Sequence, residues 1–310
     1  MIIERNVALH DKNWFGTGGV AHYFAEPGTG TEFQEALAFA ENEQMPLFVL
    51  GQGANLLVHD DGVAGLVIRP QLKAISFGKH GTVTAGAGVT VHELTDVCLA
   101  KGLVGLEEFS GIPGSVGGSV YINIHYFEFL LSAFLTEATV INRRSGELLV
   151  VDNAWFGFGY NESRLQTHEW YLVDATFQLT QVLSEEAAFA RGRRAEMIRH
   201  REKRYPAART CGSFFRNFID EEMPFLTNGK KVLNVAYFLE KVGVKGVLRV
   251  GNAIVTHQHA NMLVTLPGAT SADVVELARQ MQQLVFDAYG VTPVAECQFV
   301  GFSVNPLLTR

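Results

Sequence analysis

The segment Gly212–Asn217 holds the residue best suited to chemistry, Ser213, whose hydroxyl lies between a glycine and two phenylalanines. A run of cations precedes it, with eight Lys or Arg and two Glu between positions 191 and 209, in a chain whose net charge is −7. A local basic patch in an acidic protein favours a small anionic ligand over a nucleic acid, which requires an extended basic face. The alternative is a solvated amphipathic helix, because charge runs usually face water.

Two glycine-rich stretches could hold a phosphate. The first, 51–56, follows a short apolar run, and its Gly-x-Gly turn lets backbone N–H groups approach an anion without interference from Cβ atoms. The second, 111–119, contains four glycines and two serines and could present backbone donors and hydroxyls to one pyrophosphate. A turn without a ligand remains the alternative for each stretch.

Near the end of the chain, Glu296 is the single carboxylate of a strand-like run, 294–301. If Glu296 is partly buried, its pKa is raised and it can donate a proton; the alternative is a surface Glu on an edge strand. Among the ten histidines the closest pair is His257 and His259, which has no partners at metal-ligand spacing, so no metal is expected. Three cysteines without a C-x-x-C favour a reducing compartment.

Local patterns predict the elements that would position these residues. Thr31 with Gln34, and Thr90 with Glu93, have the spacing of a capping box, and apolar residues at helical spacing follow each pair. Strand-like runs between turns occupy residues 47–50, 65–69, 74–77, 82–85, 138–142, 148–151 and 170–177. We therefore expect a mixture of short strands and helices.

Two further helices are expected in the second half of the chain. One covers residues 185–201, through the basic segment, and is closed by Pro206. The other is capped by Ser271 and ends at Gly290. Its expected inward side chains are Val274, Leu277, Met281, Leu284, Val285 and Ala288.

Length and composition describe a soluble enzyme. A chain of 310 residues should form two or three domains, and 47% hydrophobic with 18% charged residues is ordinary for a globular protein. No run of 18 apolar residues predicts a membrane span, and the first residues have no signal pattern. Cys98 falls on the apolar face of the helix that Thr90 begins, so it is expected in the core.

Taken in order, nine motifs resemble the UDP-N-acetylenolpyruvoylglucosamine reductase (MurB) family of peptidoglycan synthesis over nearly the whole chain. They are Asn13-x-Phe15-Gly16, Gly51-x-Gly53-x-Asn55-Leu56, Gly111-Ile112-Pro113-Gly114-x-Val116-Gly117, Asn123, Phe158-Gly159-Tyr160-x-x-Ser163, Gly212-Ser213-Phe214-Phe215-Arg216-Asn217, Glu240-x-x-Gly243-x-Lys245-Gly246, His259-Ala260-Asn261 and Glu296. Without an insertion after Tyr160, the chain is similar to the shorter, type II branch of that family.

The resemblance implies an α+β fold: a two-subdomain FAD-binding fold of the vanillyl-alcohol-oxidase type, followed by a C-terminal α+β substrate domain. The expected division is residues 1–70 for the first FAD-binding subdomain, with 299–310 returning to it. Residues 71–205 would form the second subdomain, and 206–298 the substrate-binding domain.

The resemblance also implies an activity, that of a UDP-N-acetylmuramate dehydrogenase. Such an oxidoreductase uses FAD and NADPH to convert UDP-N-acetylglucosamine enolpyruvate to UDP-N-acetylmuramate, with hydride passing from flavin N5 to the vinyl CH2 carbon. The protein is then a cytoplasmic flavoprotein of cell wall biogenesis with a UDP-sugar as its small-molecule substrate. We expect a monomer, with no nucleic-acid or membrane partner.

Residue roles follow from the same resemblance. Ser213 matches the proton donor to the enolate carbon, and Glu296 matches the acid that stabilises charge on the substrate carboxylate. The implied substrate-binding residues are Tyr160, Asn161, Arg164, Arg201 and Asn217. The implied cofactor-binding residues are Gly51, Gln52, Gly53, Ala54, Asn55, Leu56, Gly114, Ser115, Gly117, Gly118, Ser119, Ile122, Asn123 and Val173.

The chain departs from the family pattern where substrate is held. Asn161 stands where the family usually has Arg, and a neutral amide cannot form a bidentate charged pair with a carboxylate. Arg164, three residues later, is a candidate replacement. The bulky residues 125–128 stand where the family has glycine, and Gln258 and Gln298 replace cations. Two alternatives therefore remain: a paralogue that keeps FAD but has another substrate or has lost the reaction, and a structural module without flavin.

Overall fold

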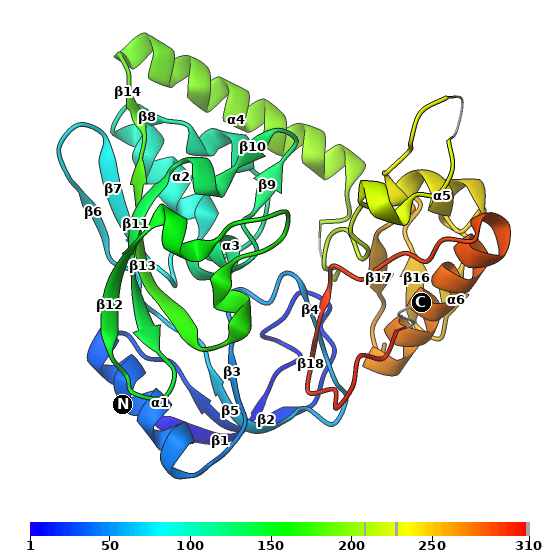
Figure 1. The fold of residues 1–310 in the computed structure, drawn as a ribbon, viewed down its shortest axis with the longest axis horizontal. Coiled ribbons are helices and arrows are strands. Elements are labelled where there is room, and N and C mark those ends of the chain that lie inside the picture. Colours follow the sequence, from blue (N-terminus) through cyan, green and yellow to red (C-terminus); the bar gives the residue numbers. More distant parts are fainter. Residues whose placement is uncertain (208, 227–228, 308–310) are drawn as a thin grey trace. The chain divides into compact units, whose positions relative to one another are not determined.

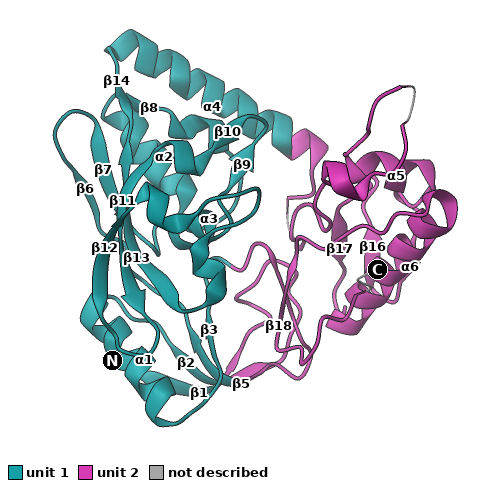
Figure 2. Cartoon of the chain, viewed as in Figure 1, with its two compact units in different colours: residues 1–6, 22–52, 65–201 teal, residues 7–21, 53–64, 202–310 magenta. Residues whose placement is uncertain are grey.

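The computed structural model describes residues 1–207, 209–226 and 229–307 as a mixture of helices and sheets (Figure 1). The chain divides into two compact units, each assembled from separate stretches (Figure 2). Unit 1 comprises residues 1–6, 22–52 and 65–201, and unit 2 comprises residues 7–21, 53–64 and 202–310. The predicted α+β class is confirmed.

The larger part of a four-stranded sheet belongs to unit 1. In the order β1-β2-β5-β3, its strands are β1 (Ile3–Ala8), β2 (Val20–Ala25), β5 (Val63–Ile68) and β3 (Leu47–Val49). Helix α1 (Gly30–Asn42) buries Phe33 and Leu37 in a core shared with Leu66 of β5. The helix is capped by Thr29, whose side chain accepts a hydrogen bond from Glu32 N. The prediction of Thr31 as the cap was therefore wrong, because Thr31 already lies in the first helical turn.

A five-stranded antiparallel sheet carries the main core of unit 1. In the order β12-β11-β13-β7-β6, its strands are β12 (Leu148–Asp152), β11 (Leu135–Asn142), β13 (Trp170–Gln178), β7 (Thr82–Gly86) and β6 (Ile75–Phe77). Ala175 of β13 faces Ala138 on one side and Ala85 on the other. These three buried alanines share a core with Val116 and Val120 of the short helix α3 (Val116–Tyr121).

Helix α2 (Val91–Ala100) begins as predicted, because the Thr90 side chain accepts a hydrogen bond from Glu93 N. Cys98 is buried as predicted, and its burial raises the pKa of the thiol to about 12. The remaining elements of unit 1 are β8 (Leu103–Val104) paired with β14 (Thr180–Gln181), the hairpin β9 (His125–Tyr126) and β10 (Phe129–Leu130), and the 3-10 turns η1 (Leu106–Phe109), η2 (Leu131–Ala133), η3 (Asn153–Phe156) and η4 (Arg164–Thr167).

The basic segment forms α4 (Ser184–Arg204), the longest helix in Figure 1. The predicted range, 185–201, agrees with its observed extent. Its polar composition leaves three buried side chains, Ala187, Ala190 and Arg194. The prediction of a helix is confirmed, although one of its cations is in the interior and does not face water.

Two small sheets and two α-helices lie wholly within the described part of unit 2. One sheet pairs β4 (Leu56–Val58) with β18 (Gln298–Val300) in parallel, and the other has the order β15-β16-β17, with β15 (Arg249–Val250), β16 (Ala253–Val255) and β17 (Leu263–Thr265). The helices are α5 (Val235–Lys241) and α6 (Ser271–Tyr289), and a 3-10 turn, η5, covers Asp220–Glu222. Phenylalanines 214, 215, 218 and 238 and the apolar face of α6 form one core.

Helix α6 corrects three details of the sequence prediction. Thr270 and not Ser271 is the N-cap, since its side chain accepts a hydrogen bond from Asp273 N. Leu284 is 39% exposed although it was expected inward, and Ala288 is also exposed. Their place toward the core is taken by Gln282, which is fully buried and donates through Nε2 to Pro293 O at 2.7 Å.

Candidate active site

The first glycine-rich turn, Gly51–Leu56, leads from β3 into β4. In the part of the chain that the structure describes, the backbone N–H groups of residues 51–55 donate no hydrogen bond. Gly53 has φ +66°, and a Cβ there would lie 2.4 Å from Lys12 O. The backbone therefore needs glycine at this position, and the turn keeps free donors of the kind that bind phosphate.

Asn55 ties the end of this turn to another segment of unit 2. Its Nδ2 donates to Glu296 O at 3.2 Å, and its carbonyl accepts from Gln298 N at 3.0 Å. Asn55 Oδ1 is buried and has no hydrogen-bond partner among the described residues. A buried acceptor without a partner costs free energy that a bound donor would recover.

The second glycine-rich turn behaves differently from the prediction that it offers many backbone donors. The N–H groups of Val116 and Gly117 already donate to Val89 O and Ala87 O, at 2.8 and 2.9 Å. The next N–H donates to the Ser115 side chain, the N-cap of α3. These bonds consume the donors at the start of α3, so they rigidify the turn. Binding through this turn therefore cannot use the N–H groups of residues 116–118 and is left to its other backbone groups and its side chains.

Within unit 1 the two glycine-rich turns touch. A Cβ on Gly51 would lie 2.7 Å from Ser115 Oγ, so glycine is required for the approach. Ala87, whose carbonyl holds Gly117, in turn donates its N–H to Val173 O at 2.8 Å. Val173 of β13 therefore supports the second turn through its backbone.

Asn123 lies two residues after α3, the helix that follows from the second turn, and connects this region to the Gly159 segment. Asn123 has φ +47° and is 2% exposed. Its Nδ2 donates to Gly159 O at 3.0 Å, and its Oδ1 accepts from Ser132 N at 3.2 Å. In the same region the rings of His125 and Tyr160 lie 4.9 Å apart, and burial lowers the pKa of His125. The bulky hairpin therefore packs against the turn that contains Tyr160.

Asn161 and Arg164 lie in different environments. Asn161 has φ +58°, and its Nδ2 is buried without a hydrogen-bond partner among the described residues. Arg164 is exposed and begins η4, with its guanidinium carbon 4.7 Å from the ring centroid of Trp155. Asn161 therefore keeps a free amide donor, while the charge of Arg164 is engaged on an aromatic face.

Arg201, near the end of α4, packs beside the second glycine-rich turn. A Cβ on Gly111 would lie 2.9 Å from Arg201 Cδ, and the guanidinium carbon is 5.4 Å from the ring centroid of Tyr126. One cation of the basic segment thus lies at the base of the hairpin.

In unit 2, the Ser213 segment runs beside the Glu296 segment. Phe215 and Ala295 form an antiparallel bridge, and Phe214 O accepts from Glu296 N at 2.9 Å. Ser213 is half-buried, and none of the described residues hydrogen-bonds to its hydroxyl. Glu296 precedes β18, so the strand expected over 294–301 is shorter than predicted.

Asn261 holds the Ser213 segment from the other side, a role that the residue pattern alone did not assign to it. Asn261 O accepts from Phe214 N at 2.8 Å, and its own N–H donates to His259 Nδ1 at 3.2 Å. Burial lowers the pKa of His259, with further lowering from Arg204 and Lys245, so the ring stays neutral and can accept. The signal for this role was present in the His-Ala-Asn triplet.

The other predicted residues fall in the same two neighbourhoods. Asn217 is exposed, and its Oδ1 accepts from Val235 N, the first residue of α5, at 3.3 Å. Unit 1 holds Gly51, Gln52, Gly114, Ser115, Gly117, Gly118, Ser119, Ile122, Asn123, Val173, Tyr160, Asn161, Arg164 and Arg201; unit 2 holds Gly53, Ala54, Asn55, Leu56, Ser213, Asn217 and Glu296. Among the described residues no helix is long and apolar enough to cross a membrane.

Comparison with known proteins decides the family. Residues 21–152 match an FAD binding domain, and residues 204–300 match the C-terminal domain of UDP-N-acetylenolpyruvoylglucosamine reductase. The chain belongs to the UDP-N-acetylenolpyruvoylglucosamine reductase family. Proteins of that name from Prochlorococcus marinus and Synechocystis are 32% and 33% identical to it, covering 96% and 97% of this chain and 98% and 91% of theirs.

A solved structure of the reductase family agrees. The UDP-N-acetylenolpyruvylglucosamine reductase of Thermus caldophilus is 29% identical, with a TM-score of 0.77 over 97% of this chain and 99% of that one. The match to the FAD binding domain covers both glycine-rich turns, and the match to the C-terminal domain covers Ser213 and Glu296. The resemblance seen in the sequence is confirmed.

The residues of this reductase fit an FAD. Among the described residues, the turn at 51–55 has backbone donors free for a phosphate. Any side chain at Gly51 would clash with Ser115 Oγ, so the close approach of the two turns requires glycine. Asn55 Oδ1 is a buried acceptor without a protein partner in the described residues. A hydrogen-bond donor of the ligand at this turn would satisfy it.

Proposed function

We propose that the protein is an FAD-dependent reductase that uses NADPH to convert UDP-N-acetylglucosamine enolpyruvate to UDP-N-acetylmuramate, a precursor of peptidoglycan. The observation that carries this proposal is the pairing of the Ser213 and Glu296 segments in unit 2, in a chain with both domains of the reductase family. A hydroxyl donor and a carboxyl group on neighbouring segments are what protonation of an enolate requires.

The reaction adds a hydride to the methylene carbon of the enol ether and a proton to the carbon that bears the carboxylate. Bound FAD, reduced by NADPH, would supply the hydride from flavin N5. We assign its binding to Gly51–Leu56, to Gly114–Asn123 and to Val173. Free backbone donors at 51–55 support the first assignment, and the rigid turn before α3 supports the second.

Ser213 is the proposed proton donor and Glu296 the proposed partner of the substrate carboxylate. The Ser213 hydroxyl has no hydrogen-bond partner among the described residues, so it is available to a ligand. Its backbone is held by Asn261, which leaves little freedom for the donor to move. Glu296 in its protonated form would donate to the carboxylate as negative charge develops there.

We assign substrate binding to Tyr160, Asn161, Arg164, Arg201 and Asn217. Asn161 is the proposed contact to the substrate carboxylate at the position where the family usually has Arg. Its buried Nδ2 supports this because the amide has no protein acceptor in the described chain. A neutral donor binds a carboxylate less strongly than a guanidinium does. Arg201 would therefore supply more of the electrostatic attraction to the substrate carboxylate.

The decisive experiment follows flavin absorbance in the absence of oxygen. NADPH is added to bleach the flavin, and UDP-N-acetylglucosamine enolpyruvate is added next. Return of the yellow colour, with UDP-N-acetylmuramate formed, supports the proposal. Protein that binds no FAD, or flavin that NADPH leaves oxidised, refutes it.

The second candidate is a flavoprotein of the same family with another substrate. Asn161 favours it, because the family usually has Arg there, and so do the bulky residues 125–128, where the family has glycine and where the His125 ring lies 4.9 Å from the Tyr160 ring. In this case NADPH bleaches the flavin and the enolpyruvyl substrate leaves it bleached.

We propose that the protein acts in the cytoplasm as a monomer. Cys98, Cys211 and Cys297 are free and buried, which suits a reducing compartment. We further propose three domains: residues 1–70 with 299–310, 71–205 and 206–298. Limited proteolysis and sedimentation of the holoprotein test these assignments.

A further inference from the structure

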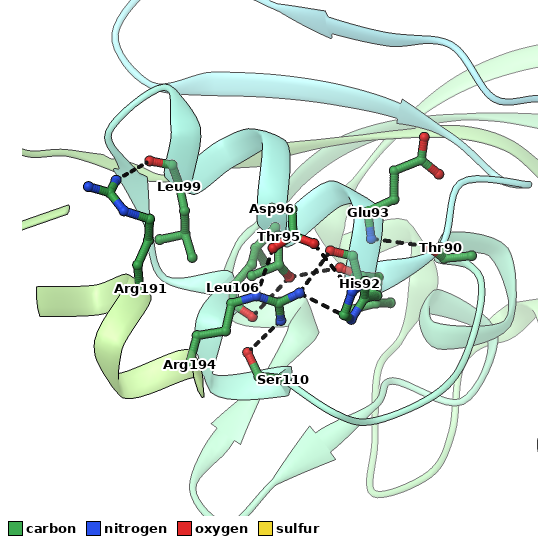
Figure 3. A network of polar contacts seen from close by, with 11 residues as sticks. Thr90, His92, Glu93, Thr95, Asp96, Leu99, Leu106, Ser110, Arg191 and Arg194 are labelled. Carbon is green, nitrogen blue, oxygen red and sulfur yellow. Dashed lines mark hydrogen bonds and ion pairs between the residues drawn. The ribbon is translucent and has the colours of Figure 1, made fainter. Parts of the chain in front are cut away.

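Helix α4 is attached to unit 1 mainly through cations. Of its described residues only Ala187, Ala190 and Arg194 are buried, so little apolar area holds it. Arg194 is 6% exposed, which is unusual for Arg, and a buried guanidinium is tolerated only when its donors are satisfied. Figure 3 shows the network in which it sits.

The guanidinium of Arg194 reaches three residues. Its Nε donates to Asp96 Oδ1 at 2.9 Å, and its Nη1 donates to Ser110 Oγ at 2.9 Å. Its Nη2 lies 3.1 Å from His92 Nδ1 and 3.4 Å from His92 O. Four contacts from a planar fork fix the direction of the side chain as well as its charge.

His92 takes the acceptor role toward Arg194. Arginine has only donors, so a hydrogen bond between Nη2 and Nδ1 requires His92 Nδ1 to accept. Nε2 lies 3.3 Å from Asp96 Oδ2 and can donate to it. Arg194 of α4 therefore closes a ring of contacts with His92 and Asp96 of α2.

Ser110 is the residue just before the second glycine-rich turn. It is 2% exposed, and its N–H donates to Glu107 O at 3.1 Å. The next residue, Gly111, packs on α4 itself: a Cβ there would lie 2.9 Å from Arg201 Cδ and 3.6 Å from Ile198 Cα. Arg194 and Arg201 lie seven residues apart on α4, and they contact two successive residues of the chain. Arg194 hydrogen-bonds to Ser110, and Arg201 packs against Gly111.

The other end of the turn is fastened to the same part of α2. Val91 N donates to Gly114 O at 3.0 Å, and Thr90 forms an antiparallel bridge with Ser115. The loop from Ser110 to Ser115 is therefore held at its Ser115 end by the start of α2 and at its Ser110 end by Arg194 of α4. Its Ser110 end depends on Arg194.

We propose that Arg194 is a positioning residue for the FAD site, holding the 110–115 loop so that Ser115 meets Gly51 and Arg201 lies beside Gly111. This inference rests on the proposed function, since it assumes that the loop contacts FAD. Arg194 acts through Ser110 and touches no reacting group. Arg191, which donates to Leu99 O at 3.3 Å, and Arg193, which pairs with Glu108, anchor α4 without reaching the loop.

The test compares FAD affinity in Arg194→Lys, Ser110→Ala and the double variant. Lysine keeps the charge near Asp96 but cannot serve three partners from one planar group. We expect the dissociation constant for FAD to rise about ten- to a hundredfold in Arg194→Lys, and less in Ser110→Ala. The double variant should bind FAD no more weakly than Arg194→Lys, because the contact that Ser110→Ala removes, Arg194 Nη1 to Ser110 Oγ, is already lost in Arg194→Lys.

Controls separate positioning from general stabilisation. Arg199 is exposed and, among the described residues, pairs with Glu196, three residues away at 2.6 Å, so Arg199→Lys should bind FAD as the wild type does. Arg191→Lys weakens an anchor of α4 elsewhere, so it should lower the thermal midpoint of FAD-free protein without a comparable loss of FAD affinity. Each variant is therefore measured for both properties.

The outcomes are distinct. If the wild type binds no FAD, the proposed function fails and the inference fails with it. If the wild type binds FAD and Arg194→Lys binds it equally well, the inference alone is overturned. If Arg194→Lys does not fold, Ser110→Ala decides: weaker FAD binding at an unchanged thermal midpoint supports the proposal, and unchanged binding refutes it.

Discussion

Asn261 and Phe215 exchange two hydrogen bonds. The side-chain amide of Asn261 pairs with the backbone N–H and C=O of Phe215, as a neighbouring strand would. Phe215 N donates to Asn261 Oδ1 at 3.0 Å, and Asn261 Nδ2 donates to Phe215 O at 2.7 Å. Both residues are buried, at 1% and 3% exposure. The backbone two residues after Ser213 is therefore fixed by a residue that itself need not touch substrate.

The first prediction concerns this pair. Asn261→Ala should lower the free energy of unfolding by about 1–3 kcal/mol, because two buried backbone groups of Phe215 lose their partners. Urea denaturation measures the change. Asn261→Asp keeps the acceptor for Phe215 N and loses only the donor, so it should fall between the wild type and the alanine variant at a pH where both fold. An alanine variant as stable as the wild type would contradict this account.

The second prediction separates the two half-reactions. In Ser213→Ala, NADPH should reduce the flavin at the wild-type rate, while reoxidation by the enolpyruvyl substrate should slow by about 10²- to 10⁴-fold, the usual contribution of a general acid. Stopped-flow absorbance measures both steps. Cys211→Ala removes a buried thiol two residues away and should leave both rates within about twofold. Equal reoxidation in Ser213→Ala would rule out the serine as proton donor.

The third prediction concerns how the carboxylate is held. Asn161→Ala should raise KM for the enolpyruvyl substrate about tenfold, and Asn161→Asp should raise it further through repulsion of the carboxylate. Arg164→Ala is the matched test of the neighbouring cation. Since Arg164 packs on Trp155, this change should cost about 0.5–1 kcal/mol of stability and alter KM little. A larger effect on KM from Arg164→Ala than from Asn161→Ala would identify Arg164 as the replacement clamp.

The fourth prediction concerns pH. Arg216, beside the Ser213 segment, donates from Nη1 and Nη2 to the Glu222 carboxylate at 2.8 and 2.5 Å. These hydrogen bonds lower the pKa of Glu222 from its ordinary value of 4.5, with a smaller contribution from Ile219 N. The folded state therefore binds the Glu222 proton more weakly than the unfolded state does, so the stabilisation is complete above pH 4.5 and disappears as the pH falls through the lowered pKa.

Glu222→Gln tests this sign. At pH 7 the variant should be less stable to urea than the wild type, and the difference should shrink as the pH falls through the lowered pKa and the wild-type carboxyl becomes protonated. A difference that grows on acidification would contradict the assignment. Glu221→Gln, at the exposed neighbouring residue, is the matched control for the substitution itself.

The fifth prediction concerns the first glycine-rich turn. Gly53→Ala combines a positive φ with a clash at Lys12 O, whereas Gly243→Ala has φ +77° and no atom within 4 Å of its Cβ. The Gly243 variant should lose about 1–2 kcal/mol from backbone strain alone. Gly53→Ala should lose clearly more and should also bind FAD more weakly. Equal losses would show that the turn opens to admit the methyl group.

Much of the local structure followed from the sequence. Thr90 and Glu93 marked the start of α2, and Phe33, Ala36, Leu37 and Ala40 marked the buried face of α1, because both signals lie within a few residues. Where two similar signals were close together, the outcome was less certain: Thr29 with Glu32 began α1, and the pair two residues later did not. Leu284 was misplaced for a related reason, since helical spacing does not show where the partner surface ends.

The candidate site was predicted in its parts. Ser213, Glu296 and the two glycine-rich turns stood out by residue type and by resemblance, and the family is now shown. The prediction that the second turn offers its backbone donors was wrong in detail, because Val89 and Ala87 accept them. Those acceptors lie some 27 to 30 residues earlier, beyond the reach of a local pattern.

What the sequence determined by itself was the set of short-range choices: caps, turns that need glycine, apolar faces and the order of motifs. The tertiary structure alone decided which polar groups are satisfied and which are left for a ligand. Arg194 is 84 to 102 residues from its partners, and Asn261 is 46 residues from Phe215. In the sequence, a run of charged residues predicts a solvated surface, and an amide side chain gives no sign of its structural role. Both depend on partners that folding brings from far along the chain, because burial and pairing are set by what packs against a residue and not by its sequence neighbours.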